Sequence, residues 1–164
     1  MSLSFQWQAI IASLAAGGSI GTAFAISSLC PMKETNTFKK PDFQPPARAF
    51  QIIWPILYIL IAVALTLYAS KVNVLKEKNY AITATVLLTF QLILGFVWIY
   101  VFNCGKKPQL GLYILLLILA VTLATMIVGQ KVSTSATAIL SPYLAWIFFA
   151  IILNSHGIVS LKNK

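Results

Sequence analysis

The stretch that decides the fold is residues 49–70, AFQIIWPILYILIAVALTLYAS, which contains no charged side chain. A helix needs about 20 predominantly apolar residues to cross the hydrocarbon core of a bilayer. This stretch is long and apolar enough to be a transmembrane helix. Four more charge-free runs of similar or greater length flank it, at residues 1–32, 79–105, 108–130 and 132–161.

The overall composition supports the same interpretation. Of the 164 residues, 59% are hydrophobic and 9% are charged, whereas soluble domains have about 45–50% and about 25% respectively. The 12 basic and 3 acidic residues all lie outside these runs, in connections too short for a separate soluble domain. The sequence therefore predicts one domain over residues 1–164, an all-α membrane protein built as a five-transmembrane-helix bundle. We expect its helices at about residues 5–29, 47–70, 80–102, 109–129 and 136–159.

The net charge of +9 comes from basic residues in the short connections at the ends of the spans. In this position they favour the lipid bilayer surface as a partner rather than nucleic acid. Eight Lys and Arg residues fall with the first and third connections and the C-terminus, and four with the second and fourth. Because basic residues concentrate in cytoplasmic connections, we expect a cytoplasmic C-terminus. A bacterial inner membrane and an organelle membrane, such as a mitochondrial one, both fit this pattern.

The two cysteines, Cys30 and Cys104, lie near the ends of spans that this topology places on the cytoplasmic side. Cytoplasmic reductants keep most thiols reduced. We therefore expect both cysteines to be free thiols.

The predicted spans are nearly free of ionisable side chains. Their charge-free runs contain by definition no Asp, Glu, Lys or Arg, and they contain a single histidine, His156. Proton relays and ion pathways usually need ionisable groups inside the membrane, and metal sites need clustered ligands. A pump is therefore disfavoured, and we expect no metal site and no required cofactor.

The first span is rich in small residues and contains Gly17 and Gly21, four residues apart. This spacing lets two helix backbones approach closely in lipid. It indicates either packing within the bundle, which we favour, or the face of a homodimer.

Uncharged polar and aromatic residues share single faces of two spans. The fifth span carries a stripe at spacing i, i+3, i+7 and i+11, formed by Tyr143, Trp146, Ala150 and Asn154. The third span carries one at i, i+4 and i+7, formed by Gln91, Gly95 and Trp98. Residues at these spacings lie on one side of a helix. Because amide side chains in a membrane need partners, we expect both stripes to point inward.

A third aromatic pair, Trp54 and Tyr58, lies beside Pro55, which cannot donate a backbone hydrogen bond inside its helix. Tryptophans from three spans, with small residues beside them, suit a pocket for a large flat apolar ligand that stacks on rings. The alternative is an aromatic belt at the bilayer surface, which we assign to Trp7 and Tyr80.

Four motifs resemble those of the TspO family, whose members are named tryptophan-rich sensory protein, translocator protein or peripheral benzodiazepine receptor. The run from Pro45 to Tyr58 resembles the second-helix signature P-P-x-x-x-F-x-x-V-W-x-x-L-Y. The run from Ser141 to Asn154 resembles the fifth-helix signature P-Y-L-x-W-x-x-F-A-x-x-L-N. Residues 91–98 are similar to the third-helix Q-L-x-L-N-x-x-W, and residues 40–43 to K-P-x-W/F in the first loop.

This resemblance implies a five-helix bundle, often dimeric, that binds porphyrins such as protoporphyrin. Some members also bind cholesterol and benzodiazepine- or isoquinoline-type drugs, and some bacterial members promote light-dependent breakdown of protoporphyrin. Trp54 and Trp146 match the tryptophans implicated in that breakdown, and Trp98 and Asn154 match family positions on the third and fifth helices.

The chain departs from the family pattern at several positions. Arg48 stands where the family commonly has tryptophan, and Gly95 and Phe96 replace Asn and Trp. An aromatic pair that follows the fifth-helix asparagine, part of a proposed cholesterol motif, is replaced by Ser155 and His156. We hypothesise that Arg48 pairs with a propionate group of a porphyrin.

The sequence thus predicts a membrane receptor or carrier-like protein that binds a porphyrin or a similar planar apolar ligand, with no other cofactor. One alternative is a light-dependent porphyrin-degrading enzyme that uses Trp54 and Trp146. Another is a sterol-binding or protein-scaffolding membrane protein. The predicted ligand-binding residues are Arg48, Trp54, Tyr58, Gln91, Trp98, Tyr143, Trp146, Ala150 and Asn154.

Overall fold

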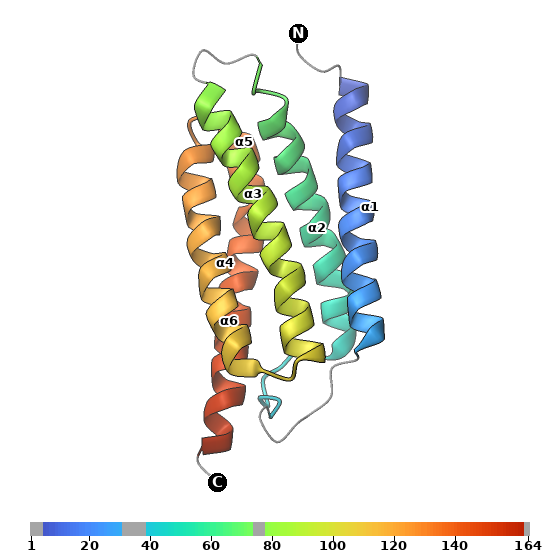
Figure 1. Ribbon diagram of the computed structural model, residues 1–164, viewed down its shortest axis with the longest axis vertical. Helices are drawn as coiled ribbons and strands as arrows, with labels where there is room; N and C mark the ends of the chain where they lie inside the picture. Colours follow the sequence, from blue (N-terminus) through green and yellow to red (C-terminus); the bar gives the residue numbers. More distant parts are fainter. Residues whose placement is uncertain (1–4, 31–38, 74–77, 163–164) are drawn as a thin grey trace.

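The computed structural model describes residues 5–30, 39–73 and 78–162, and within these residues all regular structure is helical. The helices run side by side along the long axis of the molecule (Figure 1). In chain order they are α1 (Phe5–Leu29), α2 (Ala47–Ala69), α3 (Lys78–Ile99), the π-helix η1 (Tyr100–Cys104), α4 (Pro108–Gly129), α5 (Thr134–Ile139) and α6 (Ser141–Lys162).

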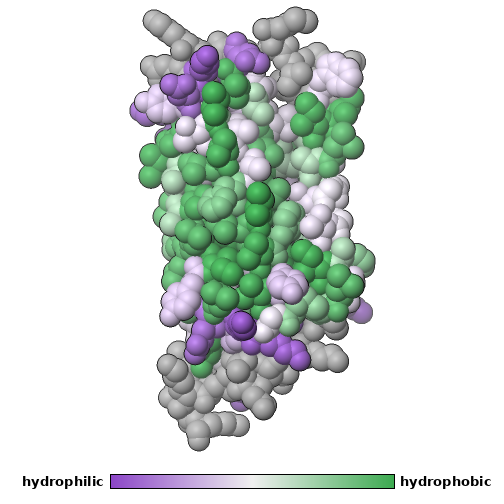
Figure 2. Space-filling view, viewed as in Figure 1, coloured by the Kyte–Doolittle hydropathy of each residue, from purple (hydrophilic) through white to green (hydrophobic). Residues whose placement is uncertain are grey.

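Five helical segments in the described residues are long and apolar enough to cross a membrane. They are α1, α2, α3 with η1, α4, and α5 with α6. Hydrophobic residues cover the middle of the visible face, and hydrophilic residues gather towards its two ends (Figure 2). The predicted five-helix membrane bundle is therefore confirmed.

The third and fifth spans are less regular than the single helices expected at 80–102 and 136–159. In the fifth span a turn at Leu140 separates α5 from α6. Pro142 explains the break, because it has no N–H to donate to the carbonyl of Ala138. The third span ends in η1, where the amide of Gly105 donates to the carbonyl of Tyr100, 3.0 Å away and five residues earlier.

The core lies between α2, α3, α4, α5 and α6. Its buried side chains are Leu57, Ile61, Ala64, Tyr68, Ala84, Leu88, Leu115, Ile118, Ala136, Leu140, Tyr143 and Ile147. None of these belongs to α1, which lies at the edge of the bundle beside α2 (Figure 1). This helix therefore forms a thin outer wall.

The glycines of α1 do not pack within the bundle as we favoured. A methyl group added at Gly17 or Gly21 would have no described atom within 4 Å, apart from its own helix. The reason is the edge position of α1, which leaves this face outside. The homodimer face, the other interpretation of the same pattern, stays a prediction.

Cys30 and Cys104 form a disulfide, so the expectation of free thiols was wrong. Their Cα atoms lie 5.0 Å apart although they are 74 residues apart in the chain. Since α1 and α3 run in the same direction, both helices end at the same face of the bundle. The positions of the two cysteines near the ends of their spans indicated that common face, but they gave no distance between the two thiols.

At the opposite end of the bundle, a buried hydrogen bond joins α2 to α5. The hydroxyl oxygens of Tyr68 and Thr137 lie 2.9 Å apart, and Tyr68 is fully buried. Gly129 at the end of α4 makes room for this pair. A methyl group there would overlap the Tyr68 hydroxyl and lie 3.1 Å from the Thr137 hydroxyl.

Gly129→Ala is therefore expected to destabilise the bundle by about 1–3 kcal/mol, the usual cost of overpacking a filled site. Reversible unfolding in dodecyl sulfate measures the change. The matched control is Gly95→Ala, because a methyl group at Gly95 has no described neighbour within 4 Å beyond its own helix. Equal effects of the two substitutions would contradict the role given to Gly129.

Candidate functional site

A cavity of about 680 Å³ lies between α1, α2, the α3–η1 segment and α6. Its size is within the roughly 300–1,000 Å³ typical of small-molecule sites. Most of its surface is apolar, as such sites usually are. The described residues that line it include none with a charged side chain. A neutral, largely apolar ligand therefore suits its interior.

The structure brings six of the nine predicted ligand-binding residues together on the wall of this cavity. They are Trp54, Tyr58, Trp98, Trp146, Ala150 and Asn154. The three others, Arg48, Gln91 and Tyr143, are not among its lining residues.

Trp54 is the centre of an aromatic cluster. Its ring centroid lies 5.9 Å from those of Tyr58 and Trp98 and 6.3 Å from that of Trp146. The Trp54 and Trp146 rings are nearly perpendicular, and the Trp54 and Tyr58 rings are stacked. Both geometries are favourable between aromatic rings. Helices α2, α3 and α6 thus present one continuous aromatic wall.

Two further aromatic residues extend this wall, and our sequence analysis missed both. The ring centroid of Phe50 lies 5.6 Å from that of Trp146, and the centroid of Phe102 lies 5.3 Å from that of Trp98. Phe50 precedes Trp54 by four residues, and Phe102 follows Trp98 by four. This spacing places each pair on one helix face. The four-residue separation from a predicted site tryptophan could therefore have identified both residues from the sequence.

Several buried polar groups on residues that line the cavity have no hydrogen-bond partner. The described residues offer none to the Tyr58 hydroxyl, the indole nitrogens of Trp98 and Trp146, or either amide atom of Asn154. Asn154 is only 2% exposed. Leaving such groups unpaired in an apolar interior costs free energy. A ligand with hydrogen-bonding atoms can remove that cost.

Two of these groups converge on α4 at Gly111. A methyl group added to Gly111 would lie 3.5 Å from the Trp98 indole nitrogen and 3.5 Å from the Asn154 amide nitrogen. The absence of a side chain there lets donors from α3 and α6 meet. Two N–H groups on residues of the cavity wall therefore lie close together beside α4.

Gln91 has a different role, although its sequence signal resembles that of Asn154. It is completely buried, and its side-chain oxygen accepts a 2.9 Å hydrogen bond from the Thr122 hydroxyl. Its amide nitrogen has no hydrogen-bond partner among the described residues. The bond to Thr122 joins α3 to α4 outside the cavity, and Tyr143 is buried in the core, so both residues support the wall.

Arg48 is exposed in the first turn of α2, next to Ala47, which lines the cavity. Its pairing with an acidic group of a ligand stays a prediction.

The described part of the first loop packs against the end of α6, next to the cavity. The amide of Lys39 donates to the carbonyl of Gly157 at 3.4 Å, and the rings of Phe43 and His156 meet edge to face at 5.1 Å. Gln44 in the same loop lines the cavity. The loop therefore forms part of the cavity wall.

Among the described residues, no group of three or more His, Cys, Asp or Glu side chains could hold a metal ion.

The contrast between Asn154 and Gln91 predicts opposite effects on the stability of the empty protein. Asn154→Leu removes buried groups without partners and is expected to stabilise it by about 1 kcal/mol. Gln91→Leu removes the hydrogen bond that the Gln91 oxygen accepts from Thr122 and is expected to destabilise it by about 1 kcal/mol. Unfolding in dodecyl sulfate without ligand measures both. A loss of stability in both variants would mean that Asn154 is a structural residue.

Comparison with known proteins identifies the family. The model of the TspO/MBR family matches residues 9–158. The chain is 31% identical over 150 residues to the Tryptophan-rich protein TspO of Chlorobaculum tepidum, which covers 90% of this chain and 93% of the relative. It is 32% identical over 154 residues to the Translocator protein homolog of Schizosaccharomyces pombe, covering 90% and 87%.

The human Translocator protein is 31% identical over 116 residues, which cover 71% of this chain and 68% of the relative. The match therefore extends to bacterial, fungal and animal proteins. With a family model matched along most of its length, the chain belongs to the TspO/MBR family.

Proposed function

We propose that this membrane protein is a receptor or carrier-like protein for protoporphyrin or a similar planar apolar ligand. The observation that carries the proposal is the cavity of about 680 Å³ with Trp54, Trp98 and Trp146 on its wall. The names of relatives, such as Tryptophan-rich sensory protein in Cereibacter sphaeroides, agree with a small-molecule role for the tryptophans.

Binding would use two kinds of contact. The ring system stacks or packs edge to face on Trp54 and Trp146, which favours large flat ligands. The unpartnered indole and amide groups near Gly111 donate to neutral acceptor atoms. Because no described lining residue is charged, the carboxylates of a porphyrin would stay at the mouth, towards Arg48.

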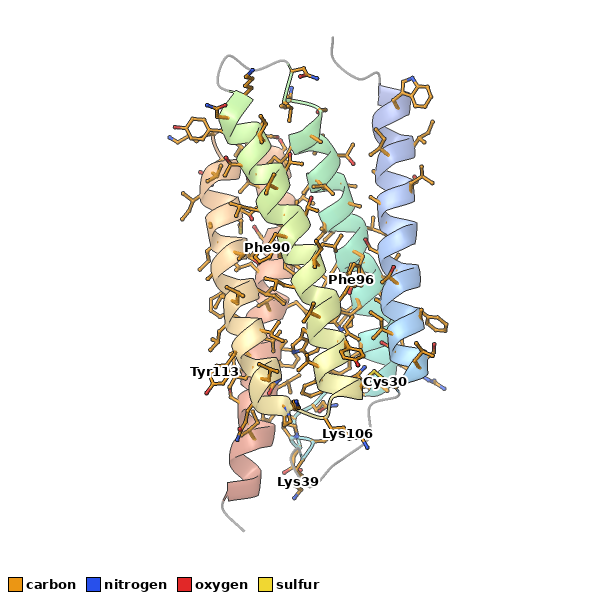
Figure 3. The ribbon with its side chains drawn as sticks, in the orientation of Figure 1. Cys30, Lys39, Phe90, Phe96, Lys106 and Tyr113 are labelled. Carbon is orange, nitrogen blue, oxygen red and sulfur yellow. A yellow bond between two sulfur atoms is a disulfide. The ribbon has the colours of Figure 1, made fainter. Side chains whose placement is uncertain are left out.

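We also propose that the end of the bundle holding Cys30 and the C-terminus faces the cytoplasm. Lys39 and Lys106 lie at this end too (Figure 3). This placement agrees with the excess of basic residues in cytoplasmic connections.

Titration of protoporphyrin into the purified protein in the dark tests the proposal. Following the Soret band of the porphyrin, rather than tryptophan emission, keeps the signal comparable between tryptophan variants. We expect saturable binding to the wild type. Trp54→Phe and Trp146→Phe should each lose about 0.5–1.5 kcal/mol of aromatic contact, or roughly two- to twelvefold in Kd.

Trp7→Phe is the matched control, because Trp7 is 59% exposed and is not among the cavity-lining residues. It should bind as the wild type does. Equal weakening in all three variants would place the porphyrin on the outer surface and reject the cavity as its site. Absence of saturable binding would reject a porphyrin as the ligand.

Light-dependent breakdown of the porphyrin is the second candidate function. It is favoured by the 6.3 Å between the centroids of Trp54 and Trp146, which lets one bound ring system contact both. Illumination of the saturated complex tests it. Loss of the Soret band in the wild type, with slower loss in Trp54→Phe and Trp146→Phe, would establish it. If the Soret band is lost at the same rate as that of free porphyrin, the protein binds the porphyrin without degrading it.

A further inference from the structure

The disulfide closes one end of the cavity. Cys30 directly follows α1, and Cys104 is the last residue of η1. Ser28, two residues before Cys30, and Asn103, directly before Cys104, line the cavity. The bond therefore joins two walls of the site at their ends, where the bundle meets the first loop (Figure 3).

The wall that the disulfide holds packs mainly along α2 and much less on α3 and η1. Among the α1 side chains that the structure describes, only Ala16 and Ser19 are buried. Phe24 lines the cavity and is nevertheless 74% exposed, so α1 is a thin wall there. Because the end of α1 makes few contacts with η1, it can separate from η1 at low cost once the bond is broken.

The disulfide is also within reach of a reductant. Both cysteines are half-buried rather than enclosed in the core. They lie at the end of the bundle that carries the larger share of basic residues, the side on which reducing conditions prevail if that end is cytoplasmic. A bond in this position is exposed to thiol–disulfide exchange.

From these three observations we propose that the Cys30–Cys104 disulfide is a redox-cleavable clamp that controls access to the cavity along α1. A dithiol reductant attacks one sulfur to form a mixed disulfide and releases the other cysteine as a thiolate. The second thiol of the reductant then resolves the mixed disulfide. In balance, the bridge takes up two electrons and two protons to give two thiols, and the reductant becomes a disulfide.

In the oxidised protein the end of α1 is held against η1, and the ligand leaves slowly. In the reduced protein α1 separates there, and the cavity opens towards the lipid. The identity of the ligand rests on the function proposed above, whereas the opening itself does not. The two claims can therefore be tested separately.

The opening is tested without ligand, on the full chain in lipid nanodiscs labelled with 5-fluorotryptophan. Fluorine resonances of Trp54 and Trp146 report on the cavity, and Trp7, which is exposed, is an internal control. We expect a dithiol reductant to increase the rate at which dissolved oxygen relaxes the fluorine resonances of Trp54 and Trp146. The relaxation rate of the Trp7 resonance should not change. Identical relaxation in both redox states would overturn the clamp.

The effect on access is tested with protoporphyrin as the probe. Reduction should speed its dissociation about tenfold, which corresponds to about 1.4 kcal/mol. The chain has two cysteines, so a Cys30→Ser, Cys104→Ser double variant leaves no other target for the reductant. It should behave as the reduced wild type with or without reductant.

The results separate this proposal from the function on which it rests. No saturable binding in either redox state, together with the fluorine response, would reject the porphyrin and keep the clamp. Equal dissociation rates in the oxidised and reduced wild type would reject control of access. A rate that changes with reductant in the double variant would also reject it, because the effect would then not pass through this disulfide.

Discussion

The structure depends on one constraint, the inability of a bilayer to satisfy backbone or side-chain polar groups. It requires spans that are helical and nearly free of charge, and five such segments make up most of this chain. It also requires each buried polar side chain to find a partner inside the protein. Tyr68 finds Thr137, and Gln91 finds Thr122. Where partners are missing, as around Asn154, we propose that a ligand supplies them.

The two kinds of polar group lie in different parts of the bundle. The satisfied pairs hold α2 to α5 and α3 to α4, within or beside the core. Most of the unsatisfied groups belong to residues that line the cavity, whose outer wall is α1. A rigid aromatic and polar surface therefore faces a helix with little buried surface of its own. We propose that this asymmetry gives the site both a fixed recognition surface and a wall that can move.

Much of the fold and of the site could be predicted from the sequence, because the charge-free runs fix the spans and the helical spacing fixes the faces. The tryptophan wall followed from that spacing. Gln91 and Asn154 could not be told apart, since each is an amide on an inward stripe and only packing decides which has a partner. The pairing of Cys30 with Cys104 depends on a distance between helices, which no local pattern contains. The break before α6 had a local signal in Pro142.

The separation between recognition and access follows from how the cavity is built. Recognition depends on side chains of α2, α3 and α6, whose positions are fixed by the core between them. Access depends on α1, whose attachment to α3 and η1 is reinforced by one covalent bond. A ligand that fills the cavity touches both parts, so its affinity and its exchange rate are set by different residues. Under the two proposals, substitution of a tryptophan changes how well the ligand fits, whereas loss of the disulfide changes how long it stays.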